Sequence, residues 1–361
     1  MKKIISLFLA VCIALPLLAQ ARREIVIPNL KGYVTLKCDF HIHTVFSDGL
    51  VWPTVRIDEA YFEGLDAISI TDHIEYRPFI KEGDVVGSHN RSYEIALSAA
   101  KARDIILIKG SEITRSMPPG HSNAIFITNS DELDKPDYMD ALRAAKTQNA
   151  FIFWNHPGWI RQAPDSAVWY PEHTKIFEQG MMHGIEVAQY GIYYPEAHRW
   201  ALEKKLTMLG NTDTHAPIQE EIDYHFWKHR TMTFVFAKDR TAEGIRDALK
   251  ERRTAVYNNE CVIGEEKYLK ELFENAVEMN VKRNGSTAHI TFKNNSDLIF
   301  HLKNTRRDSG VGYVHQCTIE PHSVNTIVVN LRSENYSGNV IFSVANFLIG
   351  PNKGLRYTIK L

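Results

Sequence analysis

Residues 33–49, with the sequence YVTLKCDFHIHTVFSDG, predict a buried strand that ends in a pair of histidines and a turn. The segment 33–40 is short and rich in apolar and β-branched residues, as buried strands are. Side chains two residues apart point to the same side of an extended chain, so His41 and His43 can bind one metal ion together. An HxH pair is a weak signal by itself. This pair, however, lies at the carboxyl end of a strand, where parallel β/α folds bind their ligands.

The segments that follow alternate between strand and helix patterns. Further strands are expected at 66–71, 105–112, 122–128, 151–155, 184–188, 207–211 and 231–236. Helices are expected between most of them, at 53–63, 88–102, 137–146, 172–179 and 195–205, and after the last strand at 241–251. This alternation predicts an α/β fold of parallel β/α units, and its first seven strands are enough for a barrel.

The pattern changes near residue 265, where a connecting helix is expected at 265–277. From residue 278 short alternating strands are separated by Asn, Gly, Ser and Pro, which predicts a small antiparallel β-sandwich of immunoglobulin-like architecture. The chain has 361 residues, of which 44% are hydrophobic and 24% charged. That length fits two domains, and that composition excludes a disordered chain. We therefore assign a barrel to 22–264 and a sandwich to 278–361.

The first 21 residues have the pattern of a signal peptide. Two lysines precede the apolar segment 4–18, and Ala19-Gln20-Ala21 is a small-x-small cleavage site. The apolar segment is too short for a comfortable membrane span. We expect cleavage near Ala21, export to the periplasm or secretion, and no stable membrane span in the mature chain.

Side chains that bind metals recur at the ends of the later strands. These residues are Asp48, His73, Glu112, His121, His156, Asp213 and His215. The carboxyl ends of parallel strands meet at one rim, so we expect these side chains to form one site with His41 and His43. A single histidine is more often a core or surface residue, and it is the whole set that indicates a metal centre.

The order CDFHIHTVFSDG, SITDH, KGSE, GHSN, NHPG and NTDTH resembles the polymerase and histidinol phosphatase (PHP) superfamily of metal-dependent phosphoesterases over residues 33–260. The resemblance implies a distorted, seven-stranded, TIM-like (β/α) barrel with two or three metal ions at its mouth. It implies one ion bound by His41, His43, Glu112 and Asp213. Glu112 would bridge to a second ion held by His121 and His156, and Asp48, His73 and His215 would hold a third. Some family members have His where this chain has Asp48, which leaves an oxygen ligand there.

Divalent ions suit the hydrolysis of phosphate esters for a physical reason. The ester and hydroxide are both anionic, and bound ions offset the repulsion and lower the pKa of water. A metal-bridging hydroxide can then be the nucleophile, with Asp213, His215 and Glu112 at the catalytic centre. Mixed imidazole and carboxylate ligands suit zinc, manganese or iron, and the ligand types alone do not identify which of these metals binds.

Other polar residues next to the ligands have two interpretations each. Asp39 and Asp72 either orient imidazole rings or cap turns. Arg115 and Arg161 lie in loops just after ligands, where a guanidinium either holds a substrate phosphate or is solvated at the surface.

The charges limit the class of substrate. The chain has 42 Lys and Arg against 43 Asp and Glu, a net charge of −1, so no global field attracts long nucleic acid. We predict an exported phosphoesterase that acts on a small phosphorylated substrate, either a phosphomonoester or a small phosphodiester. The alternative is a catalytically silent metal- or ligand-binding protein with the sandwich as its binding module. A nuclease for long DNA is disfavoured by the charge and the signal peptide.

Overall fold

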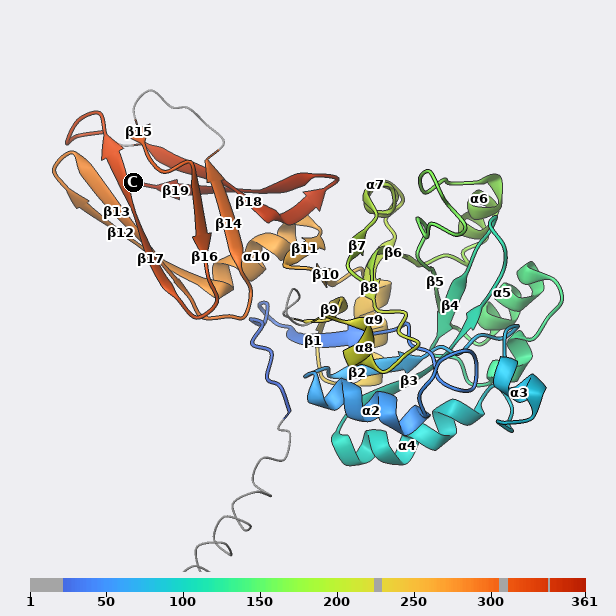
Figure 1. Cartoon of the computed structure of the whole chain (residues 1–361). Helices are drawn as coiled ribbons and strands as arrows, with labels where there is room; N and C mark the ends of the chain where they lie inside the picture. Colours follow the sequence, from blue (N-terminus) through green and yellow to red (C-terminus); the bar gives the residue numbers. More distant parts are fainter. Residues whose placement is uncertain (1–21, 224–228, 305–310, 337) are drawn as a thin grey trace, which may run out of the picture.

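The computed structural model describes residues 22–361 except 224–228, 305–310 and 337 (Figure 1). The expected signal peptide, residues 1–21, lies outside the described residues. Within those residues no helix has both the length and the apolar character to cross a membrane.

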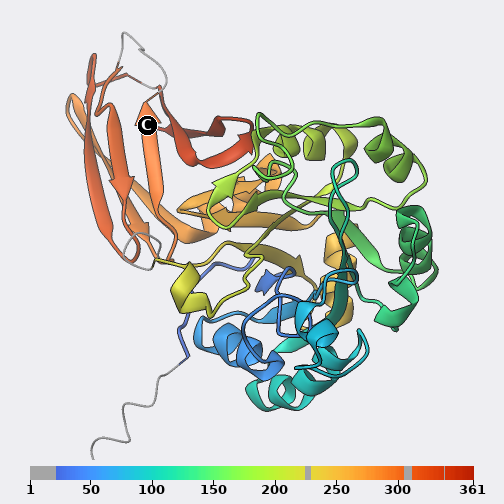
Figure 2. The same cartoon turned by 45° about the vertical axis from the view of Figure 1, so that its right-hand side comes forward.

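The first domain is a curved mixed sheet with helices around its outer side (Figure 2). Its strands are β1 (Val34–Asp39), β2 (Ala67–Ile70), β3 (Ile106–Ile113), β4 (Ser122–Ile125), β5 (Phe151–Trp154), β6 (Gly184–Gln189), β7 (Ile192–Tyr193), β8 (Thr207–Asn211), β9 (Met232–Ala237), β10 (Thr254–Asn258) and β11 (Cys261–Gly264). Its helices are α2 (Pro53–Phe62), α3 (Pro78–Glu82), α4 (Arg91–Arg103), α5 (Tyr138–Thr147), α6 (Pro171–Glu178), α7 (Pro195–Lys204), α8 (Ile218–Glu221) and α9 (Ala242–Lys250), with a 3-10 turn at Ser130–Leu133.

The strand directions depart in part from the parallel arrangement predicted. The pairs β1–β2, β2–β3, β5–β6 and β6–β8 are parallel as expected. β4 is antiparallel to both β3 and β5, and β9 is antiparallel to β1, so the prediction of uniformly parallel units is wrong there. Only the loop 114–121 joins β3 to β4, whereas a parallel connection needs a crossover of a dozen or more residues.

β8 pairs with β6 on one side, and no ladder in the described chain pairs its other side with β9. Side-chain hydrogen bonds span this gap. The Thr233 hydroxyl donates to the Gly210 carbonyl (2.9 Å) and accepts the Gly210 N–H (3.0 Å). Past the strand ends, the Asp213 N–H donates to the His41 carbonyl (2.8 Å), so the segments after β1 and β8 meet. Full closure of the barrel stays a prediction.

The second domain is a sandwich of two antiparallel sheets, as predicted. Its elements are the joining helix α10 (Glu266–Ala276) and β12 (Val277–Asn284), β13 (Thr287–Asn294), β14 (Phe300–Asn304), β15 (Val311–Gly312), β16 (Gln316–Ile319), β17 (Val324–Leu331), β18 (Asn339–Gly350) and β19 (Lys353–Lys360). One sheet has the order β12-β13-β17-β15, and the other contains β16, β14, β18 and β19. The strands β10 and β11 of the first domain were not predicted.

The two domains share a sheet and a core. β18 is 12 residues long and pairs in parallel with β11, with Val262 opposite Phe347. The rings of Phe236 on β9 and Tyr268 on α10 lie with their centroids 5.3 Å apart, and one hydrophobic core contains residues of both domains, among them Phe234 and Phe300. The second domain is therefore joined to the first by backbone pairing and by a shared core.

Candidate metal centre

The two histidines expected to share one ion lie directly after β1, and both are fully buried. The chain after them turns back at Gly49, whose N–H donates to the Thr44 carbonyl (3.0 Å). A Cβ at Gly49 would lie 2.6 Å from the carbonyl carbon of His43, so this close approach requires glycine. The turn brings Oδ1 of Asp48 to 4.0 Å from Nδ1 of His43.

Glu112 near the end of β3 and Asp213 after β8 complete the first group of ligands. Oδ1 of Asp213 lies 3.0 Å from Nε2 of His41 and 2.9 Å from Nε2 of His43. Oε2 of Glu112 lies 3.3 Å from each of these two nitrogen atoms. Ligand atoms held at about 2.0–2.2 Å from one ion are themselves roughly 3 Å apart, so these four residues have the spacing of a coordination shell.

A second group shares Glu112. Its Oε2 lies 3.0 Å from Nδ1 of His73, and its Oε1 lies 2.7 Å from Nδ1 of His121. His156, which the family resemblance assigns to this group, is further away. Its Nε2 is 3.7 Å from Oε1 of Glu112 and 3.9 Å from Oδ2 of Asp213. The structure thus brings His73 beside Glu112 and leaves His156 at the edge of the group.

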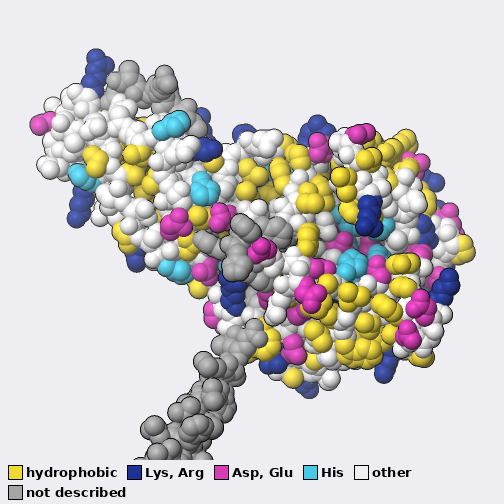
Figure 3. Space-filling view, in the orientation of Figure 1, with side chains coloured by type: hydrophobic (Ala, Val, Ile, Leu, Met, Phe, Trp, Pro, Cys, Tyr) yellow, Lys and Arg dark blue, Asp and Glu magenta, His cyan; other side chains and the backbone are white. Residues whose placement is uncertain are grey.

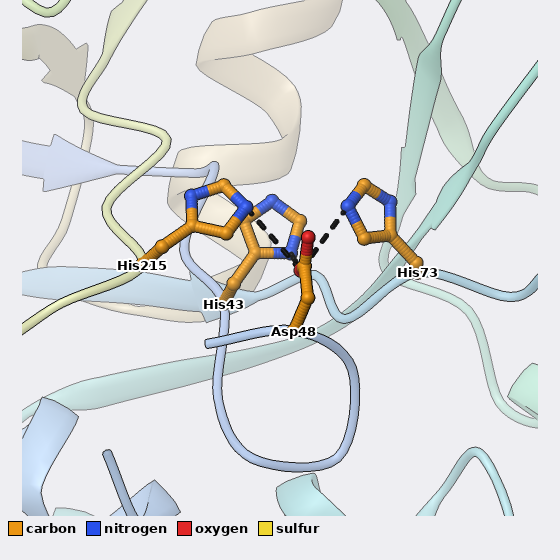
Figure 4. Close-up of side chains that lie close together, drawn as sticks. All are labelled: His43, Asp48, His73 and His215. Carbon is orange, nitrogen blue, oxygen red and sulfur yellow. Dashed lines mark ion pairs between the residues drawn. The ribbon is translucent and has the colours of Figure 1, made fainter. Parts of the chain in front are cut away.

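Asp48 lies among three imidazoles that form the third group (Figure 4). Its Oδ1 is 3.3 Å from Nε2 of His73 and 3.3 Å from Nε2 of His215. The rings of His43 and His215 stack with centroids 4.2 Å apart. The side chains of Asp48 and His215 are 25% and 33% exposed, so this group lies on the solvent side of the other two.

Three buried atoms in these groups lack a hydrogen bond of good geometry within the described chain: Nε2 of His43, Nδ1 of His121 and Oδ1 of Asp48. Leaving a buried polar atom unpaired costs free energy, and cations bound within the ligand groups would satisfy these atoms. Imidazole nitrogen and carboxylate oxygen are donors that divalent transition metals accept. The residues present therefore fit a centre for divalent cations.

The close packing of acids and imidazoles shifts their proton affinities. Burial alone would raise the pKa of Glu112, but the charges of His73, His121 and His41 outweigh it and hold that pKa well below its usual range. Burial likewise opposes the charged form of Asp213, and His41 overcomes it and holds the Asp213 pKa well below its usual range. Both carboxylates are thus ionised at neutral pH, as metal binding requires.

The ligand groups form the base of a cavity of about 440 Å³. Arg161 is the one Lys or Arg among the described residues that line it, and its guanidinium lies 5.7 Å from the centroid of the Trp159 ring. Figure 3 shows histidine and acidic side chains gathered in this hollow with a basic side chain at its edge. The cavity therefore combines an acidic, imidazole-rich base with one cation at the mouth.

One comparison with known proteins covers nearly the whole chain. A solved two-domain protein from Bacteroides vulgatus, which contains a predicted PHP-like metal-dependent phosphoesterase, is 53% identical. The match covers 95% of this chain and 100% of that one, with a TM-score of 0.92. The chain belongs to this PHP-like family.

Two further matches each cover part of the chain. The family model DUF5001, described as an Ig-like domain, matches residues 275–360, which include the sandwich. An uncharacterized protein of Methanocaldococcus jannaschii is 28% identical over 206 residues, which are 54% of this chain and 87% of that protein.

Sequence reasoning missed one buried acid of the PHP-like domain, Glu186 in β6. Its Oε1 lies 2.9 Å from Nδ1 of His41 and accepts a hydrogen bond from the Asn211 amide (2.9 Å). Its Oε2 accepts the N–H of His156 (2.6 Å). Glu186 thus fixes which nitrogen of His41 faces the centre. The available signal was a single acidic residue inside the otherwise uncharged strand GIEVAQ.

Asp39 and Asp72, for which both interpretations were open, contact backbone and hydroxyl groups, and Oδ2 of Asp39 also lies 3.4 Å from Nη2 of Arg230. Asp39 accepts the His41 N–H (3.3 Å) and hydrogen bonds from the N–H and hydroxyl of Thr212 (3.2 and 2.6 Å). Asp72 accepts the N–H of Thr44 (2.7 Å) and the hydroxyl of Ser47 (2.8 Å). Both therefore hold the turns that carry the ligands, and the turn-capping interpretation fits them.

The two candidate arginines of the PHP-like domain have different surroundings. Arg115 pairs with Glu75 and donates to the carbonyls of Thr114 and Lys135 (2.8 Å each), outside the residues that line the cavity. Arg161 is exposed and lines the cavity. Of the two, only Arg161 is placed to meet a ligand there.

Proposed function

We propose that this protein is an exported hydrolase that cleaves a phosphomonoester or a small phosphodiester with two or three divalent metal ions. The observation that carries the proposal is the overlap of the three ligand groups, which share His43, His73 and Glu112. Sites that share ligands lie close enough for their ions to contact one phosphate. Such ions, when bound, activate water and neutralise charge on the phosphate.

The roles of the protein's own residues follow from their contacts. His41, His43, Glu112 and Asp213 would hold the first ion. Glu112 and His121 would hold the second with His156 at its edge, and Asp48 and His215 would hold a third. The neutral His73 imidazole has one free nitrogen and would serve one of these two ions. Gln189 donates to Oδ2 of Asp213 (3.1 Å), which fixes that carboxylate with Oδ1 toward the histidines.

The same proposal takes the curved sheet as a distorted barrel whose mouth is this cavity. The threonine bridges between β8 and β9 support that reading, as does the contact of the segments after β1 and β8. A cavity of about 440 Å³ with one cation among its described lining residues suits a small phosphorylated substrate better than a long nucleic acid.

The test uses the chain without residues 1–21. Initial hydrolysis rates are measured on a chromogenic phosphomonoester and a chromogenic phosphodiester, with added Mn²⁺ or Zn²⁺ and with chelator, and the bound metal is counted by elemental analysis. We expect turnover that chelator abolishes and that the Asp213→Asn variant loses.

Two results would count against the proposal. The first is an Asp213→Asn variant that keeps full metal-dependent activity. The second is a protein that binds two or three ions but hydrolyses none of these esters, which would favour a metal-holding, ligand-binding protein. Export is tested separately, by fractionation of cells that produce the full chain and by sequencing the mature N-terminus.

A further inference from the structure

Three loops that carry candidate ligands also place a large apolar side chain in solvent just beyond the ligand. Leu50, Tyr76 and Ile160 follow Asp48, His73 and His156 by two to four residues. They are 62%, 54% and 71% exposed, respectively. We call Leu50, Tyr76 and Ile160 the mouth residues.

The mouth residues lie next to residues that line the cavity and do not line it themselves. The Leu50 N–H donates to the His215 carbonyl (2.7 Å), and the Tyr76 ring meets the His73 ring edge-on with centroids 6.2 Å apart. Ile160 lies between Trp159 and Arg161, which both line the cavity. Figure 3 shows hydrophobic side chains above and below the hollow that holds the histidine and acidic side chains.

An apolar rim around an ionic base restricts what binds there. Exposed apolar patches on soluble proteins mark binding surfaces, because their hydration is unfavourable. A phosphate seated against the ligand groups and near Arg161 directs its ester bond toward the solvent. A leaving group on that side comes within reach of the mouth residues, whose side chains offer methyl, methylene and ring surface to it.

We propose that the substrate is a phosphate ester whose leaving group is an apolar chain, with the phosphate at the ligand groups and the chain against Leu50, Tyr76 and Ile160. This inference rests on the proposed phosphoesterase function and adds the substrate class to it. The charge of the cavity base complements the phosphate end, and the mouth residues complement the apolar end.

The test compares kcat/KM for a series of n-alkyl phosphates from ethyl to octyl, each below its micelle concentration. Complete burial of a methylene favours binding by about fourfold, so contact along one side gives roughly twofold per methylene. We expect kcat/KM to rise by about that factor with each methylene. In the double variant Leu50→Ser/Ile160→Ser the rise is lost, while the rate on ethyl phosphate stays within about twofold.

The matched control is Val324→Ser, since Val324 is 64% exposed on β17 of the second domain. The Val324→Ser variant should keep the wild-type rise of kcat/KM with the length of the alkyl chain. A rate independent of chain length, or a double variant that loses the same factor on ethyl and octyl phosphate, overturns the inference. Either result leaves the phosphoesterase proposal intact if ethyl phosphate is hydrolysed.

A binding measurement separates the two proposals if no ester is hydrolysed. Calorimetry compares ethylphosphonate with octylphosphonate on the metal-loaded wild type and on the double variant. Tighter binding of octylphosphonate that the double variant loses supports the apolar-chain inference without any turnover. Equal affinities overturn it. Cosedimentation with phosphatidylcholine vesicles that requires the mouth residues, without a chain-length effect in solution, also overturns it in favour of a bilayer contact.

Discussion

The substitution Glu186→Gln tests whether a buried acid on β6 determines how His41 faces the metal centre. Both carboxylate oxygens of Glu186 accept hydrogen bonds, with His41 and Asn211 on Oε1 and the His156 N–H on Oε2. The amide of glutamine has one oxygen and one NH₂ group, so one side must present a donor to a donor.

The arrangement of lower free energy keeps the amide oxygen toward the His156 N–H, which lies 2.6 Å from Oε2 of Glu186 in the wild type. The NH₂ group then points at Nδ1 of His41. His41 then accepts at Nδ1 and carries its proton on Nε2, the atom that faces Asp213 and Glu112. A protonated Nε2 cannot bind a metal ion. Changes to residues that orient a ligand cost about 10- to 100-fold in metal affinity, or about 1.4–2.8 kcal/mol.

The assay is competition with a chromophoric chelator for Zn²⁺ and Mn²⁺, with the chelator-sensitive hydrolysis rate as a second readout. Excess metal should restore much of the rate of Glu186→Gln, because the loss lies in affinity. The control is Glu178→Gln at the exposed end of α6. Unchanged metal affinity in Glu186→Gln, with a folded protein by circular dichroism, would refute the role of Glu186 as the residue that positions His41.

Three further predictions concern other parts of the molecule. Burial lowers the pKa of His173 from 6.5 to about 4, while its Nδ1 accepts the Tyr170 N–H (3.0 Å) and its Nε2 donates to the Pro119 carbonyl (2.7 Å). The unfolded chain therefore binds more protons than the folded chain between these two pH values. The free energy of unfolding falls by about 3 kcal/mol as the pH drops from about 6.5 to about 4. Urea titrations across this range should show a shallower fall for His173→Gln than for the wild type, and equal falls for the two proteins would contradict this. Arg161→Ala should raise KM about three- to tenfold and leave kcat within about twofold, a range that allows for screening of an exposed cation. An unchanged KM would show that Arg161 does not bind the substrate. Gly210→Ala puts a Cβ 2.1 Å from Cγ1 of Val256 and should destabilise the protein by about 1–3 kcal/mol in denaturant titrations, whereas Gly312→Ala, with 3.8 Å to its nearest neighbour, should change little.

The sequence by itself determined the order of the elements and the chemistry of the ligands. Strand and helix periods are local, so β1 to β6 and β8 lie close to their predicted places. The candidate ligands lie at or near the ends of these strands, with Glu112 inside β3 and His121 just before β4. The types of the side chains, imidazole and carboxylate, indicated a metal centre before any distance was known. The resemblance of the motifs to the PHP superfamily agreed with the family that the 53% identical structure shows.

Only the tertiary structure decided the strand directions and the partners of each ligand. A short strand such as β4 has the same buried pattern whichever way it runs, and its direction follows from the loop before it and the neighbours it pairs with. β10 and β11 run together as a short hairpin, and β11 gains its second partner, β18, from residues about 85 positions later.

The contacts between residues of the metal centre also depend on how distant parts of the chain pack. Glu186 contacts His41 across 145 positions of the chain, and nothing in the local pattern of β6 states which face its side chain takes. His73 serves two groups while His156 lies at the edge of one, because their separations depend on how the strand ends pack and not on motif order. Residue types and local periods are written in the sequence; distances between residues far apart in the chain arise only from packing of the complete fold.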